Sequence, residues 1–593
     1  MTSDELAVSP QSVGVPSIRH LAIQRFRGIE DLSWHPGAGV NVILGGGDVG
    51  KTTIVDAVSL LLSPTIPTTL SDTDYYARNV ASGFVIDAVM SLPQHTGIDY
   101  QFKTSWPWHW NGTEAVVPDS AQAEGTPDIP VYWLRVRGTE DLDLVYEIVQ
   151  PDGTADALSV GLRRSIGLVR LGGEDRNDRD LRLVQGSALD RLLSDKSLRS
   201  RMAVHLAKSN VTEQLLSDKN EVLSTLNRAF VDQHLPHGLD LSIIGGQGAS
   251  IASMVGLTAE VGEVRLPLGS WGAGTRRLAA LAVAQQNQGQ APVTVVDEVE
   301  RGLEPYRQHT LVDKLQARPS QTFATTHSPF VIAAASKANF WYVDSAGRIG
   351  PLDGTKLKRV RENDPRMFLS RLAVVAEGAT EVGFVGAMLE RALESPLVAH
   401  GIHLCDGGGH ETTLDILEAL SEARLRFAGF ADEEKNKHPD RWKKVKEALG
   451  ALLFRWPAGC TEENVIRAVP GDQLEALLID PADEKTGERR RTLALRLNME
   501  DKNFASISAK AGANLRTLII EAALGTVPDD KAEEKKAYRS HAQQWFKTEA
   551  GGRELAAKVF SLELWPGMKE QLLPFFNAVR KALDLAESAD VKQ

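Results

Sequence analysis

Gly45-Gly46-Gly47-Asp48-Val49-Gly50-Lys51-Thr52 matches the pattern G-x-x-x-x-G-K-[ST] of a phosphate-binding loop. An apolar segment, 40–44, precedes it, and the residues from Thr52 onward have the composition of a helix. Glycine N–H groups can wrap a phosphate, and the amino end of a helix attracts anions. An ordinary glycine-rich turn would not explain a Lys-Thr pair between a strand and a helix. We expect phosphate or Mg²⁺ contacts from Gly45, Asp48, Gly50, Lys51, Thr52 and Thr53, with Lys51 on the β- and γ-phosphates and Thr52 on the ion.

The composition is that of a globular protein with several domains. The chain has 593 residues, 42% of them hydrophobic and 24% charged, which predicts two to four domains. No apolar run is long enough to span a membrane, and residues 1–17 lack a secretory signal, so we expect a cytoplasmic protein. Two cysteines exclude a disulfide framework and a cysteine-rich zinc site. The net charge of −12 argues mildly against a large nonspecific DNA surface.

The hydrophobic pattern divides the chain into four segments. Residues 18–44 predict two strands and a turn, 84–150 are rich in strand patterns, and 278–343 alternate helix with strand, which indicates a parallel α/β sheet. Leucines at helical spacing predict a helical insertion, with a role in dimerisation, and polar residues 345–368 predict a linker. The expected boundaries are 1–179 and 233–350 for the two parts of the first domain, 180–232 for the insertion, and 369–593 for a second α/β domain with a helical extension.

A second acidic motif supports the nucleotide site. Val293-Thr294-Val295-Val296-Asp297-Glu298 is a buried type of strand that ends in two acids. At the carboxyl end of a parallel strand, Asp297 would hold Mg²⁺ and Glu298 would orient the attacking water. Alone, this pattern also fits any buried strand that ends in a helix cap. Together with the phosphate-binding loop, it predicts nucleotide hydrolysis.

Two further motifs occur in an informative order. Ser270-Trp271-Gly272-Ala273-Gly274 begins a helix before Asp297, and His327 follows the next strand, where it could contact a γ-phosphate. The order resembles the head of ABC-type ATPases: phosphate loop, signature, acidic strand, D-loop and switch histidine. The resemblance implies ATP and Mg²⁺ as cofactors, and two heads that enclose ATP, with Ser270, Gly272 and Gly274 contributing as the signature. The signature departs from the common Leu-Ser-Gly-Gly-Gln form.

A different set of acids follows two strands in the C-terminal part. Leu372–Ala376 runs into Glu377 and, four residues on, Glu381; residues 425–431 run into Asp432 and Glu434. Carboxylates at the carboxyl ends of parallel strands face a common crevice and suit hard cations such as Mg²⁺ or Mn²⁺. Each acid alone is more often a helix cap or a solvated charge. Their joint pattern predicts a metal site.

This second pattern resembles a TOPRIM domain, with Glu434 where an aspartate is usual. An ABC head followed by TOPRIM resembles the OLD (overcoming lysogenization defect) family of ATP-dependent nucleases, which includes the Gabija nuclease subunit. The resemblance implies a further metal ligand, Glu462 in Cys460-Thr461-Glu462, with cysteine where serine is usual, and Glu463 as the fallback. It also implies a catalytic lysine, for which Lys547 is favoured and Lys510 is the rival. Asp406 is expected to line the same crevice.

The resulting expectation is an ATP-regulated, metal-dependent DNA endonuclease that acts as a homodimer. Its predicted catalytic residues are Glu298, Glu377, Asp432 and Lys547, and the predicted metal ligands are Thr52, Asp297, Glu377, Glu381, Asp432, Glu434 and Glu462. Antiviral defence and a helicase partner are implied only by the family resemblance, and DNA repair is the alternative role. The alternative is an ATP-driven DNA clamp or scaffold with a degenerate TOPRIM site. Primase or topoisomerase chemistry is a third interpretation, but the sequence shows neither a cysteine zinc module nor a marked tyrosine nucleophile.

Overall fold

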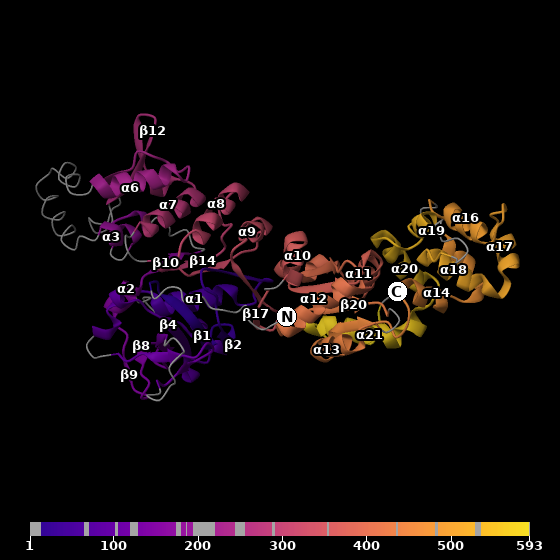
Figure 1. The fold of residues 1–593 in the computed structure, drawn as a ribbon, viewed down its shortest axis with the longest axis horizontal. Coiled ribbons are helices and arrows are strands. Elements are labelled where there is room, and N and C mark those ends of the chain that lie inside the picture. Colours follow the sequence, from indigo (N-terminus) through magenta and orange to yellow (C-terminus); the bar gives the residue numbers. More distant parts are fainter. Residues whose placement is uncertain are drawn as a thin grey trace, which may run out of the picture. The chain divides into compact units, whose positions relative to one another are not determined.

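The computed structural model divides into two compact units, which are described separately (Figure 1). The first comprises residues 1–44 and 50–341, and the second comprises 45–49 and 342–593. The structure describes residues 14–64, 70–100, 105–118, 129–172, 180–184, 187–193, 220–243, 255–286, 291–352, 355–433, 437–480, 484–527 and 535–591. Within these ranges, no helix is long and apolar enough to cross a membrane.

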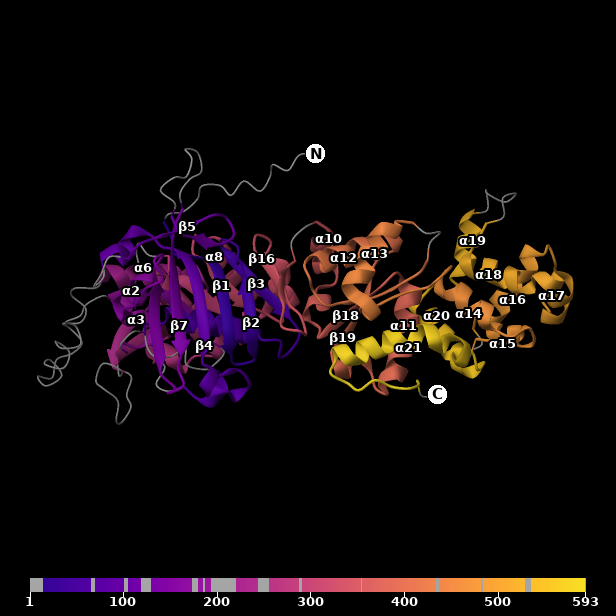
Figure 2. The same cartoon turned by 90° about the horizontal axis from the view of Figure 1, so that it is seen from below.

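An antiparallel sheet of eight strands forms one layer of the first unit, and β1, β4 and β7 lie side by side in it (Figure 2). Its path is β2-β1-β4-β7-β5-β6, with β8 and β9 joined to β7. Buried and more exposed residues alternate along β1 and β7, as expected for an antiparallel sheet with one face covered by the rest of the unit. The strands are β1 Ser17–Phe26, β2 Ile29–Trp34, β4 Phe84–Ser91, β5 Trp108–Trp110, β6 Ala115–Val116, β7 Pro130–Gly138, β8 Leu144–Val149 and β9 Ala155–Ala157.

A six-stranded sheet, in the order β10-β14-β15-β3-β16-β17, carries the phosphate-binding loop. The pairs β10–β14, β14–β15 and β15–β3 are parallel, and every residue of β3, β14 and β15 is buried. Helix α1 (Lys51–Leu62) contacts both this sheet and the antiparallel one, so most of its residues are buried. The strands are β3 Val40–Gly45, β10 Leu168–Leu171, β14 Val293–Val296, β15 Thr322–Thr325, β16 Asn339–Val343 and β17 Ile349–Pro351.

The remaining elements of the first unit surround these sheets. A small antiparallel sheet is built from β11 Asp240–Ile243, β12 Val255–Val261 and β13 Val264–Pro267. The helices are α2 Val160–Ile166, α3 Ala188–Leu193, α6 Asn220–Val231, α7 Ala273–Gln285, α8 Pro305–Gln316 and α9 Pro329–Ala334. Of the predicted insertion 180–232, α3 and α6 are described, and residues 185–186 and 194–219 lie outside the described ranges.

The second unit is built on a four-stranded parallel sheet in the order β19-β18-β20-β21. Its strands are β18 Leu372–Ala376, β19 Ile402–Asp406, β20 Ala428–Ala431 and β21 Leu453–Arg455. β18 and β20 are buried throughout, as central parallel strands are. The helices near the sheet are α10 Thr355–Asn363, α11 Ala379–Leu393, α12 His410–Glu422, α13 Pro439–Leu449 and α14 Thr461–Ala468.

The C-terminal extension of the second unit is helical and shares the hydrophobic core of the sheet. Phe575, from α21, lies 5.9 Å from the ring of Phe430 in β20 and 6.2 Å from that of Phe454 in β21. The extension contains α15 Leu474–Leu478, α16 Thr486–Arg496, α17 Phe504–Ala511, α18 Leu515–Leu524, α19 Lys535–Ala542, α20 Glu549–Ser561 and α21 Trp565–Ala582.

Helices α11 and α20 approach each other unusually closely, because glycines stand at their contact. A Cβ on Gly383 would lie 1.9 Å from the carbonyl oxygen of Glu549, and one on Gly552 would lie 2.0 Å from that of Thr380. No side chain fits at either position without moving the helices apart. This contact brings the start of α20 to the start of α11, next to the acidic residues described below.

Two expectations about the fold are wrong. Residues 18–44 contain three strands, because the short β2 (Ile29–Trp34) pairs with β1. The segment 345–368, expected to be a linker, contains β17, which is an edge strand of the six-stranded sheet, and α10, which contacts α12. Short or charged elements of this kind are stabilised by their neighbours rather than by their own hydrophobic pattern.

Candidate functional site

The phosphate-binding loop connects β3 to α1 through backbone conformations that favour glycine. Gly45 has φ +150° and Gly50 has φ +96°, and a Cβ on Gly45 would lie 2.5 Å from the carbonyl oxygen of Val343. Asp48 also has a positive φ, 57°, which aspartate tolerates better than most residues. Gly50 forms the amino-terminal cap of α1, and Lys51, Thr52 and Thr53 form its first turn. The first turn of a helix presents N–H groups that suit a phosphate.

Asp297 lies at the carboxyl end of β14 and is 6% exposed. Its Oδ1 accepts hydrogen bonds from the hydroxyls of Thr325, at 2.7 Å, and Thr52, at 3.3 Å. The two residues predicted to hold Mg²⁺, Thr52 and Asp297, are therefore in contact. A hydroxyl and a carboxylate are the donor set that a nucleotide-bound Mg²⁺ uses in phosphate-loop enzymes, so the residues fit the ion.

Sequence reasoning missed Arg277, which organises the acidic turn after β14. This arginine, on α7, is 2% exposed and donates to the carbonyl oxygens of Asp297, Glu298 (2.7 Å) and Arg301 (3.2 Å). Burial lowers the pKa of Arg277 to about 10, against the opposing effect of the acids around it. The available signal was an arginine in a helix that precedes an acid-rich turn, but its carbonyl partners depend on tertiary packing.

Glu298 and His327 flank this turn. Glu298 has φ 51°, its N–H donates to the Thr325 hydroxyl, and its partly exposed carboxylate lies 3.5 Å from Arg301. The N–H of His327 donates to Glu300, another acid to which the sequence assigned no role. Partial burial and the charge of Lys51 lower the pKa of the exposed His327 ring. His327 thus lies within electrostatic reach of Lys51.

The predicted signature residues have local roles in the structure. The Ser270 hydroxyl donates to the carbonyl of Pro267 at 2.7 Å, so it stabilises the turn in which it lies. Gly272 caps α7 and has open space at its Cβ position. Gly274 is packed against the turn that follows β14, since a Cβ there would lie 2.0 Å from the carbonyl oxygen of Gly302.

In the second unit, Glu377 and Asp432 follow the neighbouring strands β18 and β20. The N–H of Asp432 donates to Oε2 of Glu377 at 3.0 Å, and the N–H of Glu377 donates to Phe430. Parallel pairing of β18 with β20 brings these strand ends together. Asp432 Oδ1 accepts from both the N–H and the hydroxyl of Thr461, at 3.0 and 3.1 Å, so Thr461 holds one of the two carboxylate oxygens in place.

Glu462 is fully buried in the first turn of α14 and pairs with Lys547. The Lys547 Nζ lies 2.8 Å from Glu462 Oε1, which also accepts from the Thr380 hydroxyl at 3.1 Å. Burial opposes ionisation of Glu462, but Lys547 outweighs it and lowers the pKa of that carboxyl. The same Thr380 donates to Phe546, next to Lys547, so the close α11–α20 contact positions the lysine.

The buried acids repel one another. Burial and Glu462 raise the pKa of Glu381, on α11, to about 8. Burial, followed by the charges of Glu381, Glu462 and Glu377, raises the pKa of Asp432 well above its usual value. Among the described residues, no hydrogen bond reaches Oε1 of Glu381 or Oε2 of Glu462, although both atoms are buried. Orphaned carboxylate oxygens in a negatively charged cluster fit divalent cations.

His410, which the sequence did not single out, is a buried neighbour of Glu377. Its Nδ1 lies 3.4 Å from Glu377 Oε2, and its Nε2 lies 3.3 Å from the indole N–H of Trp442. Because an indole nitrogen only donates, Nε2 accepts, and the proton of a neutral ring lies on Nδ1, facing Glu377. A histidine after a glycine run was visible in the sequence, but its partner on α13 was not.

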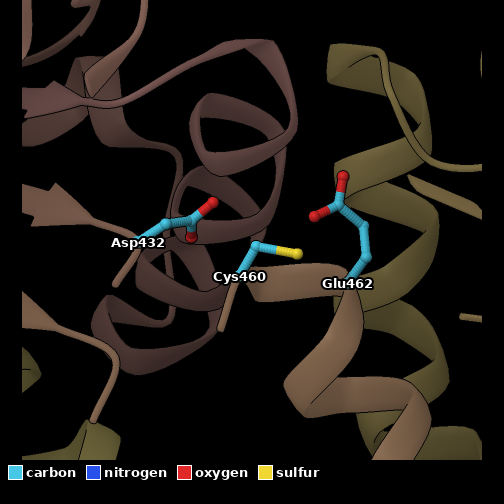
Figure 3. A group of neighbouring side chains, drawn as sticks. All are labelled: Asp432, Cys460 and Glu462. Carbon is cyan, nitrogen blue, oxygen red and sulfur yellow. The ribbon is translucent and has the colours of Figure 1, made fainter. Parts of the chain in front are cut away.

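The other predicted residues lie as follows. Asp432, Cys460 and Glu462 converge, each with a ligand atom within 4.8 Å of the others (Figure 3). Asp406 ends β19 beside β18, and its carboxylate accepts from the N–H of Gly408. Glu463, the fallback ligand, pairs with Arg467, and Lys510 is exposed on α17. Glu434 lies outside the described residues.

Comparisons with known proteins bear on the first unit. Residues 188–333 match the family model described as "AAA domain, putative AbiEii toxin, Type IV TA system". No curated protein matches the chain. This match, together with the phosphate-binding loop and the Thr52–Asp297 contact, supports an ATPase-type domain with mixed α/β structure.

Solved structures with some similarity include an Smc head bound to a domain of ScpA, with 15% identity, a TM-score of 0.37, and coverage of 58% of this chain and 99% of that one. An Smc head from Pyrococcus furiosus has 14% identity, a TM-score of 0.35, and coverage of 59% and 99%. The recombination mediator RecF has 14% identity, a TM-score of 0.35, and coverage of 57% and 99%. These scores are too low to assign a function.

Proposed function

We propose that the chain is an ATP-regulated, metal-dependent DNA endonuclease that cuts by two-metal phosphodiester hydrolysis. The observation that carries this proposal is the gathering of Glu377, Glu381, Asp432 and Glu462 at one end of a parallel sheet, within electrostatic reach of one another. Lys547 pairs with Glu462 at 2.8 Å. Buried acids at this density bind protons or cations, and carboxylate oxygens suit Mg²⁺ and Mn²⁺.

Each residue of the cluster has a distinct part in the proposed reaction. Glu377, Glu381, Asp432 and Glu462 would hold two cations, which would supply Lewis-acid stabilisation of the phosphate and lower the pKa of water. His410 orients Glu377, and Thr461 orients Asp432 through its two bonds to Oδ1. Lys547 is 37% exposed, so it can contact a DNA phosphate and stabilise the charge that develops in the transition state.

Regulation by ATP has a physical basis inside the second unit, to which the loop segment 45–49 belongs. A Cβ on Gly46 would lie 2.7 Å from the Cα of Arg371, so the two backbones are in contact. Arg371 directly precedes β18, and β18 ends at Glu377. We propose that nucleotide binding at the loop shifts this strand and so alters the acidic cluster.

The proposal includes further partners. The chain acts as a homodimer on DNA, as ABC-type heads that enclose ATP require two copies. The proposal also includes a helicase partner and a role in antiviral defence, because of the OLD family resemblance, and the cytoplasmic location expected from the sequence. Sedimentation of the full chain with and without ATP tests the dimer: a single-chain mass under both conditions would contradict it.

Nicking of supercoiled plasmid tests the proposed activity. The parent, Lys51→Ala and Glu377→Ala are assayed with Mg²⁺ or Mn²⁺, each with and without ATP. We expect Glu377→Ala to lose nicking with either metal, and Lys51→Ala to lose the response to ATP. Glu570→Ala, an exposed acid on α21, is the matched control and keeps parental activity. Equal cutting by Lys51→Ala and the parent under every nucleotide condition would contradict regulation.

The scaffold alternative makes a different prediction in the same assay. A degenerate acidic site would leave plasmid intact with every metal, while ATP would still change DNA affinity. Loss of that ATP-dependent affinity in Lys51→Ala, together with no nicking by the parent, would favour the scaffold.

A further inference from the structure

Cys460 lies inside the acidic cluster rather than beside it. It precedes α14 at the amino-terminal cap position, where its side chain makes no capping hydrogen bond and instead donates from the thiol to the Glu462 carboxylate. The N–H of Glu433 donates to the carbonyl of Gly459, which fixes the loop before Cys460 next to the end of β20. Figure 3 shows the sulfur pointing toward the Glu462 carboxylate, with the Asp432 carboxylate on the other side of Cys460.

The distances suit a shared ion. The Cys460 sulfur and one carboxylate oxygen from each of Asp432 and Glu462 lie within 4.8 Å of one another. Zinc binds sulfur at about 2.3 Å and oxygen at about 2.0–2.2 Å, which puts such donors about 3.6 Å apart at a tetrahedral angle. Side-chain movements of about 1 Å close this difference.

A second observation points to a ligand at this place. Glu462 is fully buried, and among the described residues no hydrogen bond reaches its Oε2. Lys547 and Thr380 both contact the other oxygen, Oε1. An unpartnered oxygen in a fully buried carboxylate costs free energy unless a cation meets it.

Sulfur changes which cations such a site prefers. Thiolate ligands favour zinc and related thiophilic ions, whereas all-oxygen sites favour Mg²⁺ and Mn²⁺. We propose that Asp432, Cys460 and Glu462 form a mixed sulfur–oxygen site that binds Zn²⁺ more tightly than Mg²⁺. Binding replaces the thiol proton with the metal ion and releases that proton to solvent. This inference deepens the proposed function, since it concerns two of the same carboxylates, but its test does not depend on DNA cutting.

Cobalt provides the test, because a cobalt–thiolate bond has a charge-transfer absorption in the near ultraviolet. The chain has only two cysteines, and Cys405 is buried in β19 outside the cluster, so Cys405→Ala leaves Cys460 as the sole thiol. We expect full-length Cys405→Ala to show the band with Co²⁺, and Zn²⁺ to abolish it by displacement. Absence of the band would overturn the inference. This experiment leaves Cys460 itself unaltered.

Titration calorimetry of Cys460→Ser then measures selectivity. The inference predicts at least a tenfold loss of Zn²⁺ affinity and a change of less than threefold for Mg²⁺ or Mn²⁺, relative to the parent. Equal Zn²⁺ affinity in the two proteins would overturn it. A cobalt band in a protein that never cuts DNA would reject the nuclease and keep the metal site. DNA cutting with Mg²⁺ by a protein that shows no cobalt band would reject the mixed sulfur–oxygen site and keep the nuclease.

Discussion

Asp297 in the first unit and Asp432 in the second both follow a buried parallel strand, but their surroundings differ. Asp297 Oδ1 accepts from two hydroxyls, and the carbonyls of its turn are held by the guanidinium of Arg277. Asp432 instead faces Glu377, Glu381 and Glu462, and their charges raise its pKa. The same strand-end geometry therefore yields two acids whose Oδ1 atoms each accept from two donors, and Asp432 in addition shares its site with three other buried acids. The second arrangement requires added cations more strongly.

Removal of one acid from the cluster should have the largest effect. Asp432→Asn keeps the size of the side chain but removes a charged ligand. We expect DNA nicking to fall more than about 100-fold, because mutation of residues that only hydrogen-bond to metal ligands already lowers metal affinity or activity about 10–100-fold. The matched control is Glu433→Gln, the next residue, whose carboxylate lies 3.6 Å from Arg455. This control should stay within about threefold of the parent. Equal losses in both variants would show that charge in general, not the cluster, sets the rate.

Substitution of Lys547 should lower the stability of the folded protein, because the negative charge of the cluster is then less well balanced. Lys547→Met leaves Glu462 buried without its ion-pair partner, and we expect a loss of about 2 kcal/mol at pH 8, below the full cost of a broken buried pair because Lys547 is partly exposed. Thermal unfolding in chelator measures the effect. The double variant Lys547→Met with Glu462→Gln should recover most of the loss. If it recovers nothing, the ion pair is not the cause.

The two regions also predict a pH dependence. The raised pKa values of Glu381 and Asp432 mean that the folded chain binds protons more tightly than the unfolded chain. Stability from these groups is therefore complete below about pH 4 and is lost as pH rises toward about 8. In chelator, we expect the melting temperature to fall by about 4 °C from pH 5.5 to pH 8, and Mn²⁺ to stabilise more at the higher pH.

Glu381→Gln provides the control for this pH effect, because it removes one of the two raised groups. The fall in melting temperature should shrink by roughly half in this variant. The lowered pKa of Glu462 acts in the opposite direction, but only below about pH 4.5, outside the tested range. A melting temperature that rises from pH 5.5 to pH 8 in the parent would contradict the electrostatic description.

The smallest expected effect concerns the support of Glu377. Trp442→Phe removes the indole N–H that fixes the His410 ring, while it keeps an aromatic ring beneath Arg455. We expect nicking to fall about threefold and Mn²⁺ affinity to weaken by a similar factor, with no change in ATP hydrolysis. Unchanged Mn²⁺ affinity would mean that His410 does not position Glu377.

Local motifs predicted the strands that carry both sites, but not what surrounds their acids. The strands before Asp297 and Glu377 were predicted at 293–296 and 372–376, and β14 and β18 have these bounds, because buried parallel strands are short apolar runs. Arg277, His410 and the glycine contact between α11 and α20 were missed. Each of these features depends on a partner far away in the sequence, as Gly552 depends on Thr380. The periodic pattern of a single sequence carries no signal for such pairs.

The most direct test is a crystal structure of the full chain grown with Mn²⁺, with anomalous scattering recorded at the manganese edge. The proposed function predicts manganese peaks within about 2.5 Å of carboxylate oxygens from Glu377, Asp432 and Glu462. An ordered cluster without an anomalous peak, under conditions in which the protein nicks DNA with Mn²⁺, would contradict the assignment of catalysis to these residues.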